Sequence, residues 1–242
     1  MIDNLQDNCL MEHRIKTMKR RTVLERLMPT YRKITTNNCI SLTFDDGPDK
    51  KYTPRVLDVL RKHKTKACFF LVGKKAERYP DIVGRILEEG HDIGNHTYSH
   101  PVSPIFKRQV VKDEIRLTGD IIKKITGHRP RLFRPPWLSW NMNAVEMRDI
   151  AENLGYFSIK WSISSLDWLG IRRVIKHNIF DKDINHGDIL LFHDGAEKFP
   201  LTRRQATVDL LPEIICSIRN KRLLPVKLSE LLRTQDIPLA YF

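Results

Sequence analysis

The sequence lacks any long apolar run. None of its 242 residues belong to a stretch near the ~20 consecutive apolar residues that cross a bilayer, so no membrane span is expected. The basic N-terminal segment is not followed by the apolar core of a secretory signal peptide. Cysteine is scarce as well, and Cys9, Cys39, Cys68 and Cys216 form neither a metal-binding C-x-x-C pair nor a dense disulfide framework. These absences together favour a cytoplasmic location.

Acidic residues are in the minority. The chain has 42 Lys and Arg against 29 Asp and Glu, a net charge of +13, and such an excess is compatible with a polyanionic partner such as nucleic acid. The basic residues are scattered, however, except in residues 16–21 and 61–66, and no basic motif interleaved with aromatics is present. We therefore do not expect a nucleic-acid partner, and the sequence predicts no particular oligomeric state.

Apolar, strand-like runs alternate with segments of helical periodicity from residue 39 onward. About seven such units in one domain predict a parallel sheet with covering helices, in the form of a distorted (β/α) barrel whose chemistry sits at the carboxyl ends of its strands. Residues 1–36 read as a basic, partly helical arm, and residues 37–242 as a single domain. The predicted strands are 39–44, 67–72, 91–95, 131–133, 156–163, 188–192 and 223–226, and the predicted helices begin at 54 and span 80–89, 107–126, 141–153, 171–180, 202–221 and 228–232.

Two adjacent carboxylates follow the first predicted strand. Asp45 and Asp46 come directly after residues 39–44 and before Gly47-Pro48. Successive strand residues point to opposite faces, but a turn beginning here lets both carboxylates face one site. One of them is then available to bind a metal and the other to act as a base. Simple turn chemistry is the alternative, because Asp, Gly and Pro are common turn residues.

Three histidines also follow predicted strands. His96 and His100 are four residues apart, a spacing that places Cβ atoms about 5–6 Å apart on a helical turn and lets both imidazoles reach one ion. A structural pair of loop histidines is the alternative. His193 ends the apolar run 189–192, where it reads either as a general acid or as a satisfied core residue.

Two more segments follow strand-like runs. Arg134 begins the segment Arg-Pro-Pro-Trp, whose prolines predict a rigid loop ending at Trp137. Asp167 and Trp168 come after the run 156–163. An aromatic residue beside an acid suits a sugar-binding wall, and the edge of a core is the alternative.

In this order, the five segments resemble the motifs of the polysaccharide deacetylases of carbohydrate esterase family 4, also called the NodB-homology domain. The resemblance covers about residues 39–232 and is most specific in 43–48 (TFDDGP) and 96–101 (HTYSHP). It implies that residues 37–242 form a catalytic domain that removes N-acetyl groups from oligo- or polysaccharides containing N-acetylglucosamine, with release of acetate. Since many relatives are secreted and no signal is found here, we expect a small cytoplasmic oligosaccharide or sugar conjugate as substrate.

The resemblance also implies a metal site. Asp46, His96 and His100 correspond to three ligands of a divalent ion, usually Zn²⁺, with Co²⁺ accepted in relatives. Asp45 corresponds to the general base that takes a proton from the attacking water. His193 corresponds to the general acid that protonates the leaving amine.

The same resemblance assigns supporting roles to the remaining positions. Arg134 corresponds to an arginine beside the base, and Asp167 to a carboxylate that orients the general acid. The backbone N–H of Trp137 would help to hold the oxyanion, while Trp168 and Leu191 would line a pocket for the acetyl methyl group. Two alternatives stay open: a non-catalytic sugar-binding module of the same fold, and a deacylase that acts on a different amide or on an O-acetyl ester.

Overall fold

The computed structural model describes residues 38–101, 107–137, 144–196 and 203–233 of the chain. The predicted arm, residues 1–36, lies outside them, so the arm and its boundary with the domain stay predictions, as does the cytoplasmic location. Among the described residues, no helix is both long and apolar enough to cross a membrane.

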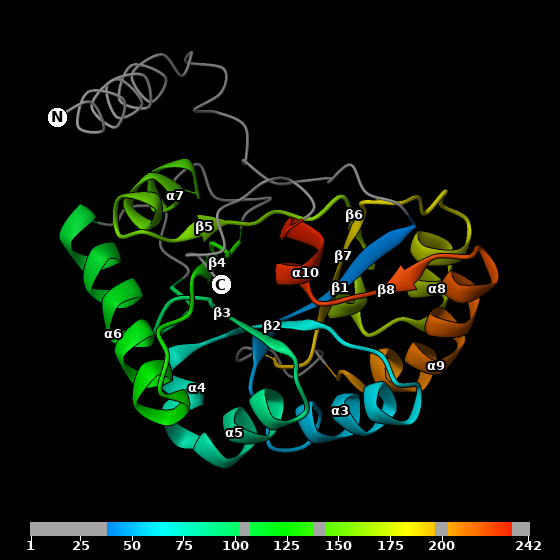
Figure 1. Cartoon of the computed structure of the whole chain (residues 1–242), viewed down its shortest axis with the longest axis horizontal. Coiled ribbons are helices and arrows are strands. Elements are labelled where there is room, and N and C mark those ends of the chain that lie inside the picture. Colours follow the sequence, from blue (N-terminus) through cyan, green and yellow to red (C-terminus); the bar gives the residue numbers. More distant parts are fainter. Residues whose placement is uncertain (1–37, 102–106, 138–143, 197–202, 234–242) are drawn as a thin grey trace, which may run out of the picture.

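Eight parallel strands form one curled sheet in the described part of the chain (Figure 1). Their order is β5-β4-β3-β2-β1-β7-β6, and β8 pairs with the first residues of β1. Because every pairing is parallel, the carboxyl ends of the strands meet at one edge of the sheet. The strands are β1 Cys39–Gly47, β2 Cys68–Leu71, β3 Asp92–Asn95, β4 Leu132–Phe133, β5 Phe157–Ser158, β6 Ile163–Ser164, β7 Ile189–His193 and β8 Leu224–Pro225.

Helices surround the curled sheet, and α10 lies inside the curl (Figure 1). This arrangement confirms the predicted distorted (β/α) barrel of about seven parallel strands in a single domain. The helices are α3 Thr53–Lys62, α4 Gly73–Arg78, α5 Pro80–Glu88, α6 Arg108–Thr126, α7 Ala144–Asn153, α8 Arg172–Phe180, α9 Gln205–Asn220 and α10 Leu228–Arg233, with the short 3₁₀ helix η1 at Asp167–Leu169.

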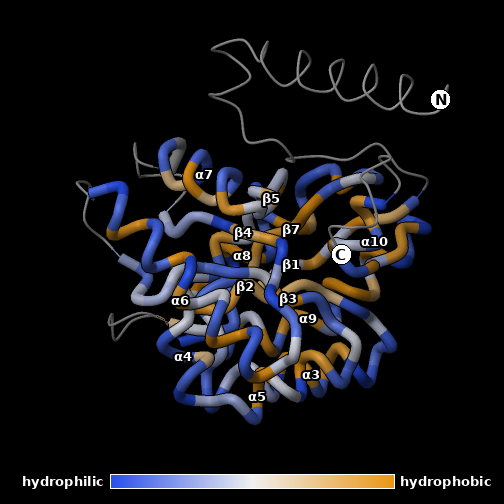
Figure 2. The backbone as a smooth tube through the Cα atoms, turned by 60° about the vertical axis from the view of Figure 1, so that its left-hand side comes forward, coloured by the Kyte–Doolittle hydropathy of each residue, from blue (hydrophilic) through white to orange (hydrophobic). Residues whose placement is uncertain are grey.

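The core explains which way β1 faces. Its even-numbered residues Ile40, Leu42 and Phe44 are fully buried and pack with apolar residues of α3 and α9. Phe44 stacks on Phe69 of β2 with 5.1 Å between ring centroids, and burial of each such side chain stabilises the fold by about 1.5–3 kcal/mol. Figure 2 shows hydrophobic and hydrophilic positions alternating along the surrounding helices. The odd-numbered residues of β1, Asp45 among them, consequently face the inside of the barrel.

One predicted strand is wrong. Residues 156–163 form two strands, β5 and β6, which lie at opposite ends of the sheet order. The backbone N–H of Ile159 still donates to the carbonyl oxygen of Phe133 in β4, whereas that of Ser162 donates to the carbonyl oxygen of Ile189 in β7. The chain therefore changes partners between residues 159 and 162 and connects the two edges of the sheet. A run of strand-forming residues carries no sign of such a change.

Other differences are local. The structure contains α4, which the sequence does not predict, because Gly73–Arg78 has a single aliphatic residue, Ala76, and thus no apolar periodicity. Strand β1 continues to Gly47, beyond the predicted end at residue 44. The first residues of the predicted helices 141–153 and 202–221 lie outside the described residues.

Candidate active site

The polar segments singled out in the sequence meet at the carboxyl edge of the sheet, as predicted. They come from β1, from the connections after β3, β4 and β6, and from β7. The residues that these segments contribute are Asp45, Asp46, His96, His100, Arg134, Trp137, Asp167, Trp168, Leu191 and His193.

The two carboxylates of β1 reach one site because of an irregularity in the strand. Asp45 pairs with Phe70 of β2, but the register shifts before Gly47 pairs with Leu71. Asp46 occupies this bulge with a left-handed φ of 71°. A bulge inserts one residue and breaks the alternation of faces. Both acids therefore reach the same imidazole: Nε2 of His96 is 3.9 Å from Oδ2 of Asp45 and 3.5 Å from Oδ1 of Asp46, which confirms the predicted convergence.

Backbone strain gathers around the site. Positive φ values occur at Asp46, Thr97 (67°), His100 (51°), Trp137 (56°) and Leu166 (54°), all in the segments that form this edge. A left-handed conformation costs a non-glycine residue roughly 1–2 kcal/mol. Such conformations persist where surrounding contacts hold them, and they are typical of functional sites.

Asp46, His96 and His100 form a compact set of metal-ligand atoms. One ligand atom from each lies within 4.8 Å of the others, and Oδ1 of Asp46 is 3.1 Å from Nε2 of His100 and 3.5 Å from Nε2 of His96. Burial alone would raise the pKa of Asp46, but the imidazoles of His100 and His96 hold it well below its usual value. The carboxylate is thus ionised, as a ligand must be.

The hydrogen bond at the back of His96 fixes its tautomer. Nδ1 lies 2.6 Å from the carbonyl oxygen of Arg134. A carbonyl only accepts, so Nδ1 carries a proton, and Nε2, on the side of Asp46, is the nitrogen left to bind a metal. One carboxylate and two imidazoles are a ligand set typical of zinc and related divalent ions. The residues present therefore fit the metal that the resemblance implies.

Asp45 is held by a buried guanidinium. Nη1 of Arg134 donates to Oδ1 of Asp45 at 2.7 Å and to Oγ1 of Thr43 at 2.8 Å. The Arg134 side chain is fully buried and lies over the ring of Phe70, 4.1 Å from its centroid. The charge of Arg134 lies in a buried, low-dielectric environment, where its attraction to a carboxylate is strong. The predicted contact between Arg134 and the candidate base is present.

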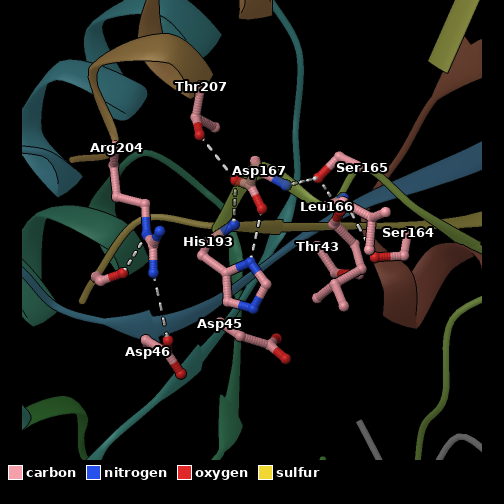
Figure 3. Close-up of polar contacts among 12 residues, drawn as sticks. Thr43, Asp45, Asp46, Ser164, Ser165, Leu166, Asp167, His193, Arg204 and Thr207 are labelled. Carbon is pink, nitrogen blue, oxygen red and sulfur yellow. Dashed lines mark hydrogen bonds and ion pairs between the residues drawn. The ribbon is translucent and has the colours of Figure 1, made fainter. Parts of the chain in front are cut away.

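Asp167 and His193 form a second buried pair (Figure 3). Nδ1–H of His193 donates to Oδ1 of Asp167 at 2.7 Å, while the backbone N–H of His193 and the hydroxyl of Thr207 both donate to Oδ2. Burial lowers the pKa of His193, but the Asp167 carboxylate, through its charge and its hydrogen bond, and to a smaller extent Asp46 raise it, and the net shift is upward. Burial would raise the pKa of Asp167, yet His193 keeps it below its ordinary value. The pair favours a protonated imidazole beside an ionised carboxylate.

The three residues assigned to substrate binding differ in how they are placed. The ring of Trp137 packs edge-on against His100, with 5.2 Å between centroids, which puts this residue beside the metal ligands. Leu191 is buried in β7 between Thr43 and Ser164. Trp168 is exposed in η1. The oxyanion role of the Trp137 backbone and the acetyl pocket of Trp168 and Leu191 stay predictions.

Three charged residues at the site escape analysis of the sequence. Asp194 is buried beside Gly47 and accepts from the Thr53 hydroxyl at 2.5 Å. Burial raises the pKa of Asp194 to about 7, with a further rise from Asp46 that the Thr53 hydrogen bond opposes. Lys75 and Arg204 both contact Asp46. The adjacency of Asp194 to His193 is the one sequence signal that was available; Lys75 and Arg204 are ordinary surface-type residues in the sequence.

Comparison with known proteins agrees with this geometry. Residues 32–159 match the family model described as polysaccharide deacetylase. Two peptidoglycan-N-acetylglucosamine deacetylases of Bacillus cereus are 37% and 36% identical over 75% and 80% of the chain. A third such enzyme, PgdA of Listeria monocytogenes, is 36% identical over 69% of the chain. The chain spans 64% and 88% of the lengths of the two Bacillus cereus proteins and 34% of the Listeria protein.

Solved structures of the same type superimpose well. A peptidoglycan N-acetylglucosamine deacetylase in complex with 4-naphthalen-1-yl-N-oxidanyl-benzamide has a TM-score of 0.74 and 34% identity, covering 83% of this chain and 91% of its own. A carbohydrate esterase family 4 pseudoenzyme from Bacillus anthracis has a TM-score of 0.73 and 26% identity, over 88% and 72%. With the matched model, the relatives and the converging motif residues in agreement, the chain belongs to the polysaccharide deacetylase family, carbohydrate esterase family 4.

Proposed function

We propose that the protein is a metal-dependent N-deacetylase that acts on N-acetylglucosamine residues of peptidoglycan or of its oligosaccharide fragments. The named activities of its relatives support the substrate class. The geometry supports the reaction type, because the site combines a metal-ligand set with two separate groups suited to proton transfer.

Asp46, His96 and His100 would hold the cation, with Zn²⁺ the first candidate and Co²⁺ the second. Three protein ligands leave a coordination position open, as catalytic sites need. When bound, a divalent cation would lower the pKa of a water molecule to about 7 and would polarise an acetyl carbonyl. The hydrogen bond from Nδ1 of His96 to Arg134 would keep this ligand oriented.

Asp45 is the proposed general base. Its Oδ1 is occupied by Arg134, and its Oδ2 lies 3.9 Å from Nε2 of His96, on the side of the ligand set. Oδ2 is therefore the oxygen placed to accept a proton from the attacking water. The fixed guanidinium holds the carboxylate in this orientation, and such positioned proton transfer contributes about 10²–10⁴-fold to the rate.

His193 is the proposed general acid. An amide nitrogen cannot leave as an anion, so a proton has to reach it as the carbon–nitrogen bond breaks. Nδ1 of His193 is engaged by Asp167, which leaves the proton on Nε2 for transfer. Asp167 holds the tautomer and favours the protonated ring, since its charge raises the pKa of His193 against the effect of burial.

One observation carries the proposal: the base and the acid are directly paired residues of neighbouring strands. Asp45 of β1 is in register with His193 of β7, so both side chains point to the same face of the sheet. Figure 3 shows the His193 ring directed toward Asp45. An accidental pair of core residues would not place a base and an acid on one face beside three metal-ligand groups.

A non-catalytic sugar-binding module is the second candidate, because a structural relative is described as a pseudoenzyme. The fold alone does not separate the two possibilities. This chain retains the candidate ligands, base and acid, and each has the hydrogen-bond or ion-pair partner expected of it. That retention favours catalysis.

The test is acetate release from N-acetylglucosamine oligomers and peptidoglycan fragments, measured with and without chelator. We expect turnover that chelation abolishes and Zn²⁺ or Co²⁺ restores. Asp45→Asn should keep bound metal but lower kcat by about 10²–10⁴-fold, whereas Asp58→Asn, at an exposed ion pair, should not. Binding of the oligomers without acetate release would favour the sugar-binding module, and release from O-acetylated substrates alone would reassign the bond that is cleaved.

A further inference from the structure

Two cations outside the motif segments contact Asp46. We propose that Lys75 and Arg204 are positioning residues that hold this candidate metal ligand, Lys75 through its backbone and Arg204 through its carboxylate. The inference rests on the proposed function in one respect, since it takes Asp46 to be a metal ligand.

Lys75 fixes the backbone of Asp46. Its Nζ donates to the carbonyl oxygen of Asp46 at 2.9 Å and to that of Ala196 at 3.0 Å. Asp46 has a left-handed φ of 71°, a conformation that needs support from its surroundings. A half-buried ammonium group on the carbonyl of that residue supplies it, and the same group ties β1 to the segment after β7. The helix α4, which carries Lys75, thereby takes part in shaping the site.

Arg204 and the two histidines lie near different oxygens of the Asp46 carboxylate. Nη2 of Arg204 lies 3.9 Å from Oδ2, while Oδ1 faces His100 at 3.1 Å and His96 at 3.5 Å. Figure 3 shows the guanidinium directed at Asp46. A rotation of the carboxylate would move Oδ1 away from the imidazoles. The cation therefore favours the one rotamer in which Oδ1 joins the two histidines.

The position of Arg204 is itself tightly constrained. Its side chain is 2% exposed, and its Nε–H donates to the carbonyl oxygen of Gly195 at 2.5 Å. Its Nη1 has no hydrogen-bond partner among the described residues. A buried charge is costly unless carboxylates offset it, and Arg204 also lowers the pKa of Asp167. Arg204 thus lies among the acids of the site, near both Asp46 and Asp167.

The segment that both cations bind is pressed against Asp46. A Cβ atom built on Gly195 would lie 1.9 Å from the backbone oxygen of Asp46. This closeness explains how Lys75 reaches Asp46 and Ala196 together. The same closeness suggests a simpler alternative, in which the two cations stabilise only the segment after β7 and have no effect on metal binding.

Measurements of metal affinity distinguish the proposed positioning role from this alternative. Arg204→Met and Lys75→Met would be compared with Arg203→Met and Lys74→Met, which alter exposed neighbours of the same charge. Zn²⁺ affinity of the full chain is measured by competition with a chromophoric chelator, together with the melting temperature and the visible absorption band of bound Co²⁺. Loss of an outer contact to a ligand typically weakens metal binding about 10- to 100-fold. We expect that loss, with a changed Co²⁺ band, in the first two variants and in neither control.

Arg204→Lys keeps the charge and should bind Zn²⁺ several-fold more tightly than Arg204→Met. Folded Lys75→Met and Arg204→Met proteins that bind Zn²⁺ as the wild type does would overturn the inference and leave the proposed function standing. Equal losses in the controls would overturn it too. If Arg204→Met does not fold, Lys75→Met, which replaces a less buried side chain, decides by the same criterion. A wild-type chain that binds no divalent cation would contradict the proposed function and this inference together.

Discussion

Replacing Asp167 by Asn tests whether His193 is a charged general acid. Asp167 accepts three hydrogen bonds, two of them from His193. The charge-assisted bond from Nδ1–H is worth about 1.5–3 kcal/mol. At 1.36 kcal/mol for each tenfold change, its loss moves the equilibrium between neutral and protonated imidazole by roughly 10- to 150-fold toward the neutral form. Burial, which lowers the pKa of His193, is then unopposed by the neighbouring carboxylate.

The sign of the effect follows from the direction of the shift. The raised pKa keeps His193 protonated, and this form is lost as the pH rises through the pKa, so kcat falls on the alkaline side. Asp167→Asn should move the alkaline limb of the kcat profile to lower pH and reduce kcat above that limb by about the same 10- to 150-fold. The assay is acetate release from an N-acetylglucosamine oligomer across the pH range.

A matched control exists on the surface. His177 and Asp181 form an exposed pair with the same atoms in contact at 2.8 Å. Asp181→Asn should leave the kcat profile in place. An alkaline limb that stays at the wild-type position in a folded Asp167→Asn protein would refute the role assigned to this carboxylate.

Three further outcomes are expected. Gly195→Ala, which places a methyl group against the backbone of Asp46, should lower the melting temperature and metal affinity together; an unchanged melting temperature would contradict that close approach. Arg134→Met leaves Asp45 buried without its partner and should cost about 3–5 kcal/mol of unfolding free energy in urea, whereas Arg108→Met at an exposed pair should not; equal effects would count against the buried pair. Burial lowers the pKa of His91 to about 4. The imidazole is therefore protonated near pH 6.5 in the unfolded chain but only near pH 4 in the folded chain. As the pH falls between these values, the free energy of unfolding should decrease by about 3 kcal/mol. His91→Gln should remove most of that slope, and an unaltered slope in urea titrations at several pH values would show that other groups cause it.

The barrel could be predicted from the sequence because its evidence is local and repeated. Apolar runs such as residues 39–44 and 188–192 read as buried strands, and Gly127 ends α6 in a left-handed conformation, as expected of a glycine after a helix. The prediction of a single strand at residues 156–163 is wrong, because the change of partner from β4 to β7 depends on pairing within the folded sheet and not on the local sequence. The helix α4 was not predicted either, because its six mostly charged residues show no apolar face.

The candidate site likewise contains some residues that can be recognised in the sequence and others that cannot. Asp45, Asp46, His96 and His100 stand out because they occur in a motif whose chemistry is readable from residue type and spacing. The convergence of both carboxylates was predicted, although a bulge within β1 produces it and the strand continues through Gly47. Lys75 could not be found in this way, since its contact with Asp46 joins residues 29 positions apart and exists only after folding.

The pairing of Asp45 with His193 has a consequence for how such a protein can change. Both residues lie within adjacent strands, so the separation of the two proton carriers is set by the backbone ladder, and a slip of one residue would turn the side chains away. The connections that leave the same edge are not held by this ladder, although those after β3 and β6 carry His96, His100 and Asp167. Insertions beyond these residues can reshape the surface around the site for a different glycan while the separation of Asp45 and His193 stays the same.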